Sequence, residues 1–123
     1  METYLLKRTL KEFRGTEHYH QHLFPGKSPI LLTDGCDFVR NECKAWWLFD
    51  AILSYQIDQR LKAVPFQIWE LKQQRSDLSW LLTCREDVGK KLLISQRIEF
   101  SDFPLEGIKI WLIDGVALLP SEY

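Results

Sequence analysis

The sequence predicts an α+β fold, in which N-terminal helices are followed by a four- or five-stranded antiparallel sheet packed against a long central helix. Two observations support this class. Apolar residues recur at helical spacing in the first half of the chain, whereas apolar and polar residues alternate in the second half. Strands and helices do not alternate along the chain, so the connections that a parallel sheet needs are missing.

Length and composition indicate one globular domain. The chain has 123 residues, of which 46% are hydrophobic and 27% are charged, and both are ordinary values for a globular protein. We expect a single domain over residues 1–123, mainly helical to about residue 62 and built of antiparallel strands from about 65 to 120. Sixteen Lys and Arg residues are interspersed with seventeen Asp and Glu residues. Nucleic-acid binding is therefore disfavoured, because a surface that follows phosphates normally carries a basic excess.

Two helices are predicted before residue 24. The first spans about residues 4–13, where Leu6, Leu10 and Phe13 recur at positions i, i+4 and i+7. Thr16 can cap a short second helix that runs to about residue 23. The breaker-rich segment that follows, residues 24–29, contains two prolines and a glycine and would end this helix.

Two further helices are predicted between residues 33 and 60. Thr33 or Asp34 can accept a hydrogen bond from the free amides at the start of the first of them. The second is the long central helix, over about residues 45–60, which is polar only near its end. A helix that is apolar nearly all round is expected to be covered on several sides.

Four or five strands are predicted after Pro65, over about residues 66–72, 78–84, 92–100, 108–113 and 116–119. The first and fourth of these carry apolar residues on both faces, which indicates central positions in the sheet or a second covering layer. The dipeptide Asp114-Gly115 is typical of a two-residue hairpin turn, which would join the last two strands.

Asp50 is the main candidate for a functional side chain. It lies in the middle of an apolar run, and a carboxylate that leaves water without partners is strongly destabilising. Trp46 lies one turn before it and Ser54 one turn after it, so the three would form a column on one helix face. Asp50 either bonds donors in the core, such as Arg40, or lines a pocket with Trp46 and Ser54. In a pocket these three would be ligand-binding candidates and Asp50 a catalytic candidate.

Asp34 is the second catalytic candidate, although its place before a glycine also fits a helix cap. The segment from His18 to His22 is the nearest match to a metal site. On a helix His18 and His22 would share one face, whereas a strand would align all three histidines. A third ligand would still be needed, and a partly exposed polar helix explains the same residues. His18 and His22 are therefore only weak metal candidates, and no cofactor is expected.

Cysteine usage and hydropathy indicate a cytoplasmic protein. Cys36, Cys43 and Cys84 are odd in number and include no Cys-x-x-Cys pair, so reduced thiols are expected. The N-terminus lacks the pattern of a secretion signal. Asp50 interrupts the longest apolar run well before the ~20 residues that cross a bilayer, so no membrane segment is expected.

Five motifs spread over nearly the whole chain: Phe13-x-Gly15-Thr16-Glu17, Thr33-Asp34-Gly35, Trp47-Leu48-x-Asp50-Ala51-Ile52-x-Ser54-Tyr55-Gln56, Asp102-Phe103-Pro104-Leu105 and the ending Leu118-Leu119-Pro120-Ser121-Glu122-Tyr123. With these motifs the chain resembles an uncharacterised bacterial family of small proteins of unknown function. Among the histidines, His18 and His22 are closer to the family's pattern than His20. The resemblance implies a cytosolic protein of a bacterium, or of its phages or plasmids, and it implies no activity.

No complete catalytic set is present, since the sequence has neither a Gly-x-Ser-x-Gly motif nor a Gly-rich phosphate loop. We therefore favour a non-enzymatic binding or accessory protein, whose partner is a protein or a small ligand. The alternative is a small enzyme or metal-dependent hydrolase that uses Asp50, Asp34 and the pair His18 and His22. A third hypothesis is a homo-oligomer joined by an exposed strand edge or by a face of tryptophans. The chain has five tryptophans in all.

Overall fold

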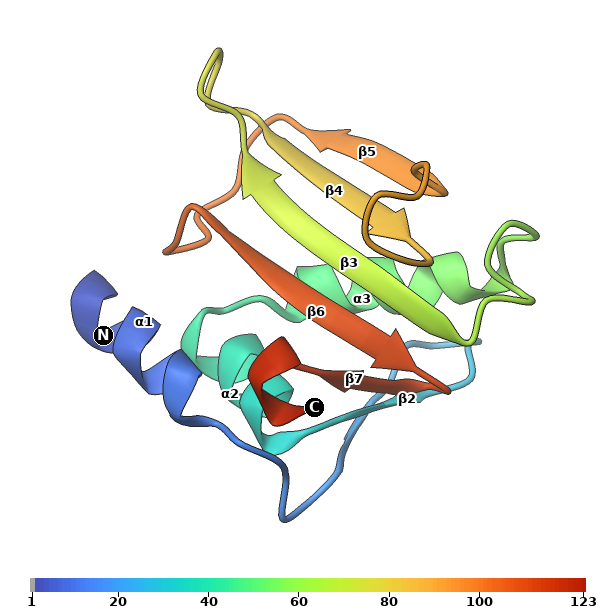
Figure 1. Cartoon of the computed structure of the whole chain (residues 1–123), viewed down its shortest axis with the longest axis horizontal. Coiled ribbons are helices and arrows are strands. Elements are labelled where there is room, and N and C mark those ends of the chain that lie inside the picture. The colour runs from blue at the N-terminus through green and yellow to red at the C-terminus, as the bar shows by residue number, and fades with distance from the viewer. Residues whose placement is uncertain (1) are drawn as a thin grey trace.

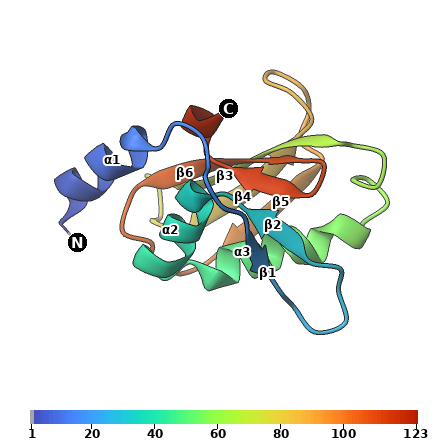
Figure 2. The same cartoon turned by 90° about the horizontal axis from the view of Figure 1, so that it is seen from below.

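The computed structural model describes residues 2–123 and shows one sheet with helices on both sides (Figures 1 and 2). The helices are α1 (Thr3–Glu12), α2 (Asp34–Glu42) and α3 (Trp46–Ser54), with the short 3-10 helices η1 (Tyr55–Ile57) and η2 (Pro120–Glu122). The strands are β1 (His20–His22), β2 (Ile30–Leu32), β3 (Phe66–Gln73), β4 (Trp80–Arg85), β5 (Ile94–Ile98), β6 (Gly107–Ile113) and β7 (Val116–Leu118). The α+β class is confirmed.

The sheet is larger than predicted and it is mixed. Among residues 2–123 it has seven strands in the order β1-β2-β7-β6-β3-β4-β5, and β2 runs parallel to β7 while all other pairs are antiparallel. The five C-terminal strands were predicted, but β1 and β2 were not. The expected helix over about 16–23 is wrong, because residues 20–22 pair with residues 30–32 instead. Strands of three residues are too short to show an alternating pattern.

The helices differ from the prediction mainly in the centre of the chain. The helix expected near residues 4–13 is confirmed as α1, and Thr33 caps α2 by accepting the N–H of Cys36 at 3.3 Å. The long helix expected over 45–60 is wrong, since α3 ends at Ser54 and continues only as η1. Asp58 accepts the backbone N–H of Arg60 at 2.9 Å, a local bond that competes with continuation of the helix.

Two helices, rather than one long helix, cover the inner face of the sheet. Figure 2 shows α2 and α3 on one side, with the C-terminal turn on the other side and α1 beside β6. The inner residues of β3, Trp69 and Leu71, are buried in a core cluster that includes Phe49 of α3. On the outer face Phe66 and Trp111 form an aromatic cluster with Tyr123, with ring centroids 5.4 to 6.1 Å apart. The strands with two apolar faces, β3 and β6, are central strands as expected.

The predicted hairpin is confirmed between β6 and β7. Asp114 and Gly115 have φ values of 47° and 82°, the left-handed conformation that a two-residue turn of this kind requires at both positions.

All three cysteines are free and buried, and burial raises the pKa of Cys84 to about 12. No helix within residues 2–123 has both the length and the apolar character needed to cross a membrane.

Candidate functional site

His22 and Asp50 form the centre of a polar cluster between β1 and the two inner helices. The His22 side chain is fully buried, and its Nε2 lies 2.7 Å from Oδ1 of Asp50 on α3. Its Nδ1 lies 3.1 Å from a guanidinium nitrogen of Arg40 on α2. Because arginine can only donate, Nδ1 accepts and Nε2 carries the proton that it donates to Asp50. His22 is therefore neutral. Burial lowers the pKa of His22, and this effect exceeds that of the hydrogen bond and charge of Asp50, which raise it.

Arg40 joins three elements through one buried guanidinium. It donates to the carbonyl of Gln21 at 3.1 Å and to Oδ1 of Asp37 at 2.8 Å, and its Cζ lies 4.1 Å from the ring centroid of Trp46. Asp37 and Arg40 are three residues apart, which places them on the same face of α2. Nε of Arg40 has no hydrogen-bond partner within residues 2–123. Arg40 therefore ties β1, α2 and the start of α3 to one another.

His20 extends the cluster to the second carboxylate candidate. Nε2 of His20 lies 2.9 Å from Oδ1 of Asp34, and Nδ1 lies 3.8 Å from the carboxylate of Asp37. Asp34 also accepts the backbone N–H of Glu17 at 2.9 Å. These contacts, led by His20, lower the pKa of Asp34 to about 2. His20 and His22 reach one network because residues i and i+2 of a strand point to the same face.

Glu122 links the C-terminal turn to the start of α2. Its carboxylate accepts the hydroxyl of Thr33 at 2.6 Å and the N–H groups of Gly35 and Leu119 at 3.0 and 2.9 Å. A Cβ atom on Gly35 would lie 2.5 Å from Oε1 of Glu122, so a glycine is needed for this approach. The Thr33-Asp34-Gly35 motif and the terminal motif therefore meet in space. We call these contacts of Glu122 the C-terminal clasp.

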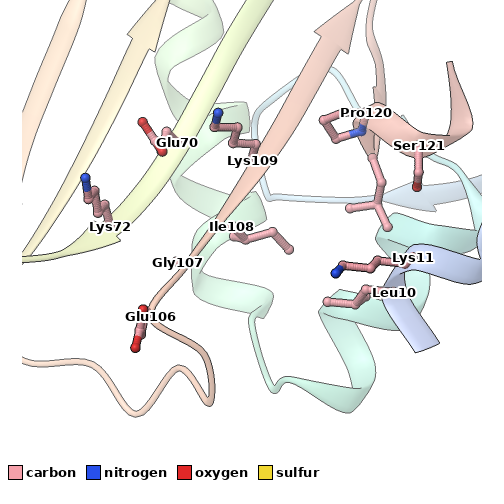
Figure 3. A pocket seen from close by; sticks show the side chains of 11 residues that line it. Leu10, Lys11, Glu70, Lys72, Glu106, Gly107, Ile108, Lys109, Pro120 and Ser121 are labelled. Atoms are coloured by element: carbon pink, nitrogen blue, oxygen red, sulfur yellow. The ribbon is translucent and has the colours of Figure 1, made fainter. Parts of the chain in front are cut away.

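A cavity of about 480 Å³ lies on the other side of the molecule, between α1, the first half of β6 and the C-terminal turn (Figure 3). Its apolar lining comes mainly from Leu10, Ile108, Leu119 and Pro120. Its charged lining consists of three lysines and two glutamates, namely Lys11, Lys72, Lys109, Glu70 and Glu106. None of the five forms a salt bridge with another residue of the range 2–123.

The structure keeps the predicted column on α3 but places it away from the cavities. Trp46 is 49% exposed and stacks on Arg40, and the Asp50 side chain is 39% exposed. Ser54 is half-buried at the end of α3. The five surface cavities described for residues 2–123 do not include these three residues in their lining. Asp50 has a hydrogen-bond partner within the fold, as one of the two expectations required. This partner is His22 and not Arg40.

The two metal candidates lie in different surroundings. His18 is exposed in the segment before β1, whereas His22 is buried at the end of β1. The i, i+4 argument for this pair fails because the segment is not helical. Within residues 2–123, no three His, Cys, Asp or Glu side chains are grouped closely enough to hold a metal ion.

Three participants in these contacts were not among the candidate site residues chosen from the sequence: His20, Asp37 and Glu122. The spacing of His20 and His22 by two residues was a usable signal, but only for a segment recognised as a strand. The spacing of Asp37 and Arg40 by three residues was a second signal within a correctly predicted helix. Glu122 gave no local signal, since its partners are about ninety residues away in the chain. The cavity combines both ends of the chain and could not be seen in any local pattern.

Comparison with curated proteins and with solved structures gave no significant match. A comparison with family models gave one match, which covers almost the entire chain, residues 4–123. This agrees with the resemblance expected from the five motifs. The chain therefore belongs to the family described as a family of unknown function (DUF6876).

Proposed function

We propose that this protein is a non-catalytic binding protein and that the cavity between α1, β6 and the C-terminal turn takes its ligand. The observation that carries this proposal is that the charged side chains around the cavity form no salt bridges within residues 2–123. Five charged side chains surround an apolar lining and none of them forms a salt bridge within residues 2–123. The volume of about 480 Å³ falls within the range of small-ligand sites.

The lining indicates the chemistry of the ligand. Leu10, Ile108 and Pro120 are half-buried and offer apolar surface whose burial is favourable by about 25 cal/mol per Å². Three lysines against two glutamates leave one net positive charge around this surface. A ligand with an apolar body and one acidic group therefore matches the cavity best.

The polar cluster gives less support to the enzymatic alternative. Both ring nitrogens of His22 are engaged, so proton transfer to a substrate would require His22 to leave Arg40 or Asp50. Asp34, with its pKa lowered to about 2, is a weak base whose two oxygens already accept hydrogen bonds. These contacts favour a role of His22 and Asp34 in holding β1 against α2 and α3.

The proposal is tested by screening a library of small organic fragments by NMR against the uniformly ¹⁵N-labelled protein. We expect carboxylic acids with an apolar body to shift the amides of residues 10–11, 107–109 and 119–121. Leu10→Trp, which fills the cavity, should abolish these shifts. Leu10→Met conserves the volume of the side chain and should retain them. Binding that survives Leu10→Trp, or shifts that centre on Asp50 and His22, would contradict the proposal.

We infer from the cysteine usage and the family resemblance that the protein works in the bacterial cytoplasm, and from the incomplete catalytic set that it binds a protein or a small ligand there. A fractionation experiment in the source organism checks the location. Light scattering on a sizing column checks the separate hypothesis of a homo-oligomer, since a monomer at high concentration would rule it out.

A further inference from the structure

β6 has a free edge inside the cavity. β3 pairs with all of β6, from Gly107 to Ile113, whereas β7 pairs only with residues 111–113. After Leu118 the chain leaves the sheet and Pro120 begins η2. The first half of β6 therefore has a neighbour on one side only, although β6 lies in the middle of the sheet.

The backbone groups of Gly107 and Lys109 point to this free edge. In an antiparallel pair, alternate residues direct their N–H and C=O groups to one neighbour and then to the other. The amide of Gln73 on β3 donates to the carbonyl of Glu106 at 2.9 Å, which assigns Glu106 to the side of β3. Gly107 and Lys109 accordingly point away from β3. We find no hydrogen bond to their backbone groups within residues 2–123.

We propose that the occupant of the cavity is an extended peptide segment of a partner protein, which adds a strand to the free edge of β6. This proposal rests on the binding function proposed above and names the class of ligand. A segment opposite Gly107 and Lys109 can form up to about four backbone hydrogen bonds, and strand addition of this kind is a common mode of peptide recognition. Its alternate side chains would face Leu10 and Pro120, which line the cavity and supply apolar contacts.

The segment carries an acidic side chain that faces α1. Lys11 extends from α1 toward β6 in Figure 3, and it forms no salt bridge within residues 2–123. On β6, by contrast, Lys109 lies directly opposite Glu70 of β3 in the strand register, so its cross-strand neighbour is a residue of opposite charge, although the two form no salt bridge. On the side of α1, Lys11 is therefore the positive charge that an acidic residue of the segment would meet.

The surroundings of the edge favour a flexible segment over a second folded copy of the chain. The free edge spans only residues 107–110, and residues of both α1 and η2 line the cavity beside it. Sheets of two folded copies usually join along longer, unobstructed edges. A short extended peptide can enter between α1 and η2.

The test uses random linear heptapeptides displayed on phage, selected on the full-length protein and then resynthesised for titration. Lys109→Pro removes the N–H at the free edge without removing a bond to β3, and Lys109→Ala removes the same charge but keeps the N–H. We expect enriched peptides with an acidic residue among apolar ones. We also expect Kd to rise at least tenfold more in Lys109→Pro than in Lys109→Ala. Equal affinity for these two variants, or no enrichment over Lys109→Pro, would overturn strand addition.

Amide hydrogen exchange gives a second readout that does not depend on any variant. The amides of Gly107 and Lys109 should exchange quickly in the free protein and become protected when a selected peptide binds. The amides of Ile108 and Ile110 bond to β3 and should be protected in both states. Unchanged exchange at residues 107 and 109 would overturn the proposal.

The charge of the segment is tested separately. Lys11→Glu should weaken a selected acidic peptide at least fivefold more than Lys11→Gln does, and equal weakening would contradict the acidic contact. Fragments that bind in the cavity while no peptide depends on the Lys109 amide would overturn strand addition alone. Failure of both fragments and peptides would overturn the binding function as well.

Discussion

The charged side chains on the two sides of the sheet differ in whether they bond to one another. On the side of α2 and α3, His22, Asp50, Arg40 and Asp37 bond to one another and little of His22 or Arg40 meets solvent. Around the cavity on the other side, five charged side chains have no salt bridge within residues 2–123. Groups that satisfy each other stabilise the fold, whereas unpaired groups beside an apolar surface remain available to a ligand.

Removal of Arg40 is expected to have the largest effect on stability. Arg40→Ala would leave the carboxylate of Asp37 and Nδ1 of His22 without their buried partner. Loss of one member of a buried charged network typically costs about 3–5 kcal/mol. Urea denaturation should show this loss in the free energy of unfolding. Arg40→Lys keeps the charge but not the planar fork and should lie between wild type and Arg40→Ala. A loss below about 1 kcal/mol for Arg40→Ala would mean that the cluster is not a stabilising unit.

Gly35→Ala should destabilise the protein by about 1–3 kcal/mol, because its Cβ would displace the carboxylate of Glu122 from the C-terminal clasp. The same substitution in a Glu122→Ala background should cost less, since the displaced group is already absent. A double-mutant cycle by thermal denaturation measures this coupling. Additive losses from the two substitutions would show that Gly35 does not act through Glu122.

Acid should destabilise the protein through His22, whose pKa is lower in the folded protein than its ordinary value of 6.5. The unfolded chain then binds the proton first, so the free energy of unfolding falls as the pH drops below about 6.5 toward the lower folded pKa. Each unit between the two pKa values corresponds to about 1.4 kcal/mol.

Urea denaturation between pH 5 and 8 measures this slope. His22→Gln should flatten it, whereas His18→Gln, at an exposed histidine, should leave it unchanged. A slope that persists in His22→Gln would assign the pH dependence to another group.

The cavity lysines should matter least for stability. Lys72→Ala and Lys11→Ala remove exposed charges that form no salt bridge within residues 2–123, so each should change the free energy of unfolding by less than about 0.5 kcal/mol. The same variants should weaken binding of acidic fragments in the NMR titration. A large loss of stability would mean that the lysines serve the fold, and the contrast between the two sides would then disappear.

The sequence predicted what depends on neighbours along the chain and missed what depends on distant partners. The Thr33 cap, the Asp114-Gly115 turn and the five C-terminal strands follow from local spacing, and all are present. β1 and β2 have only three residues each, so their periodicity carried no signal. This error moved His22 onto the wrong element and hid the partner of Asp50, which is 28 residues away.

The candidate site was harder to predict than the fold for the same reason. Asp50 stood out because one charge in an apolar helix is visible in the sequence, and it has a hydrogen-bond partner in His22. Lys11 and Lys109 carry no such signal, since an exposed lysine is ordinary in any helix or strand. Only the folded chain brings α1, β6 and the C-terminal turn around one cavity.

The parallel pair of β2 and β7 joins segments that lie more than eighty residues apart in the chain. β2 contributes residues 30–32 and β7 residues 116–118, and the N–H of Thr33 donates to the carbonyl of Ala117 at 3.0 Å. Contacts of such high sequence separation raise the contact order and slow folding. During synthesis, β1 and β2 cannot join the sheet until the ribosome has released β7. β2 therefore stays without its partner β7 for most of translation, and a strand edge left unpaired in this way is prone to aggregation.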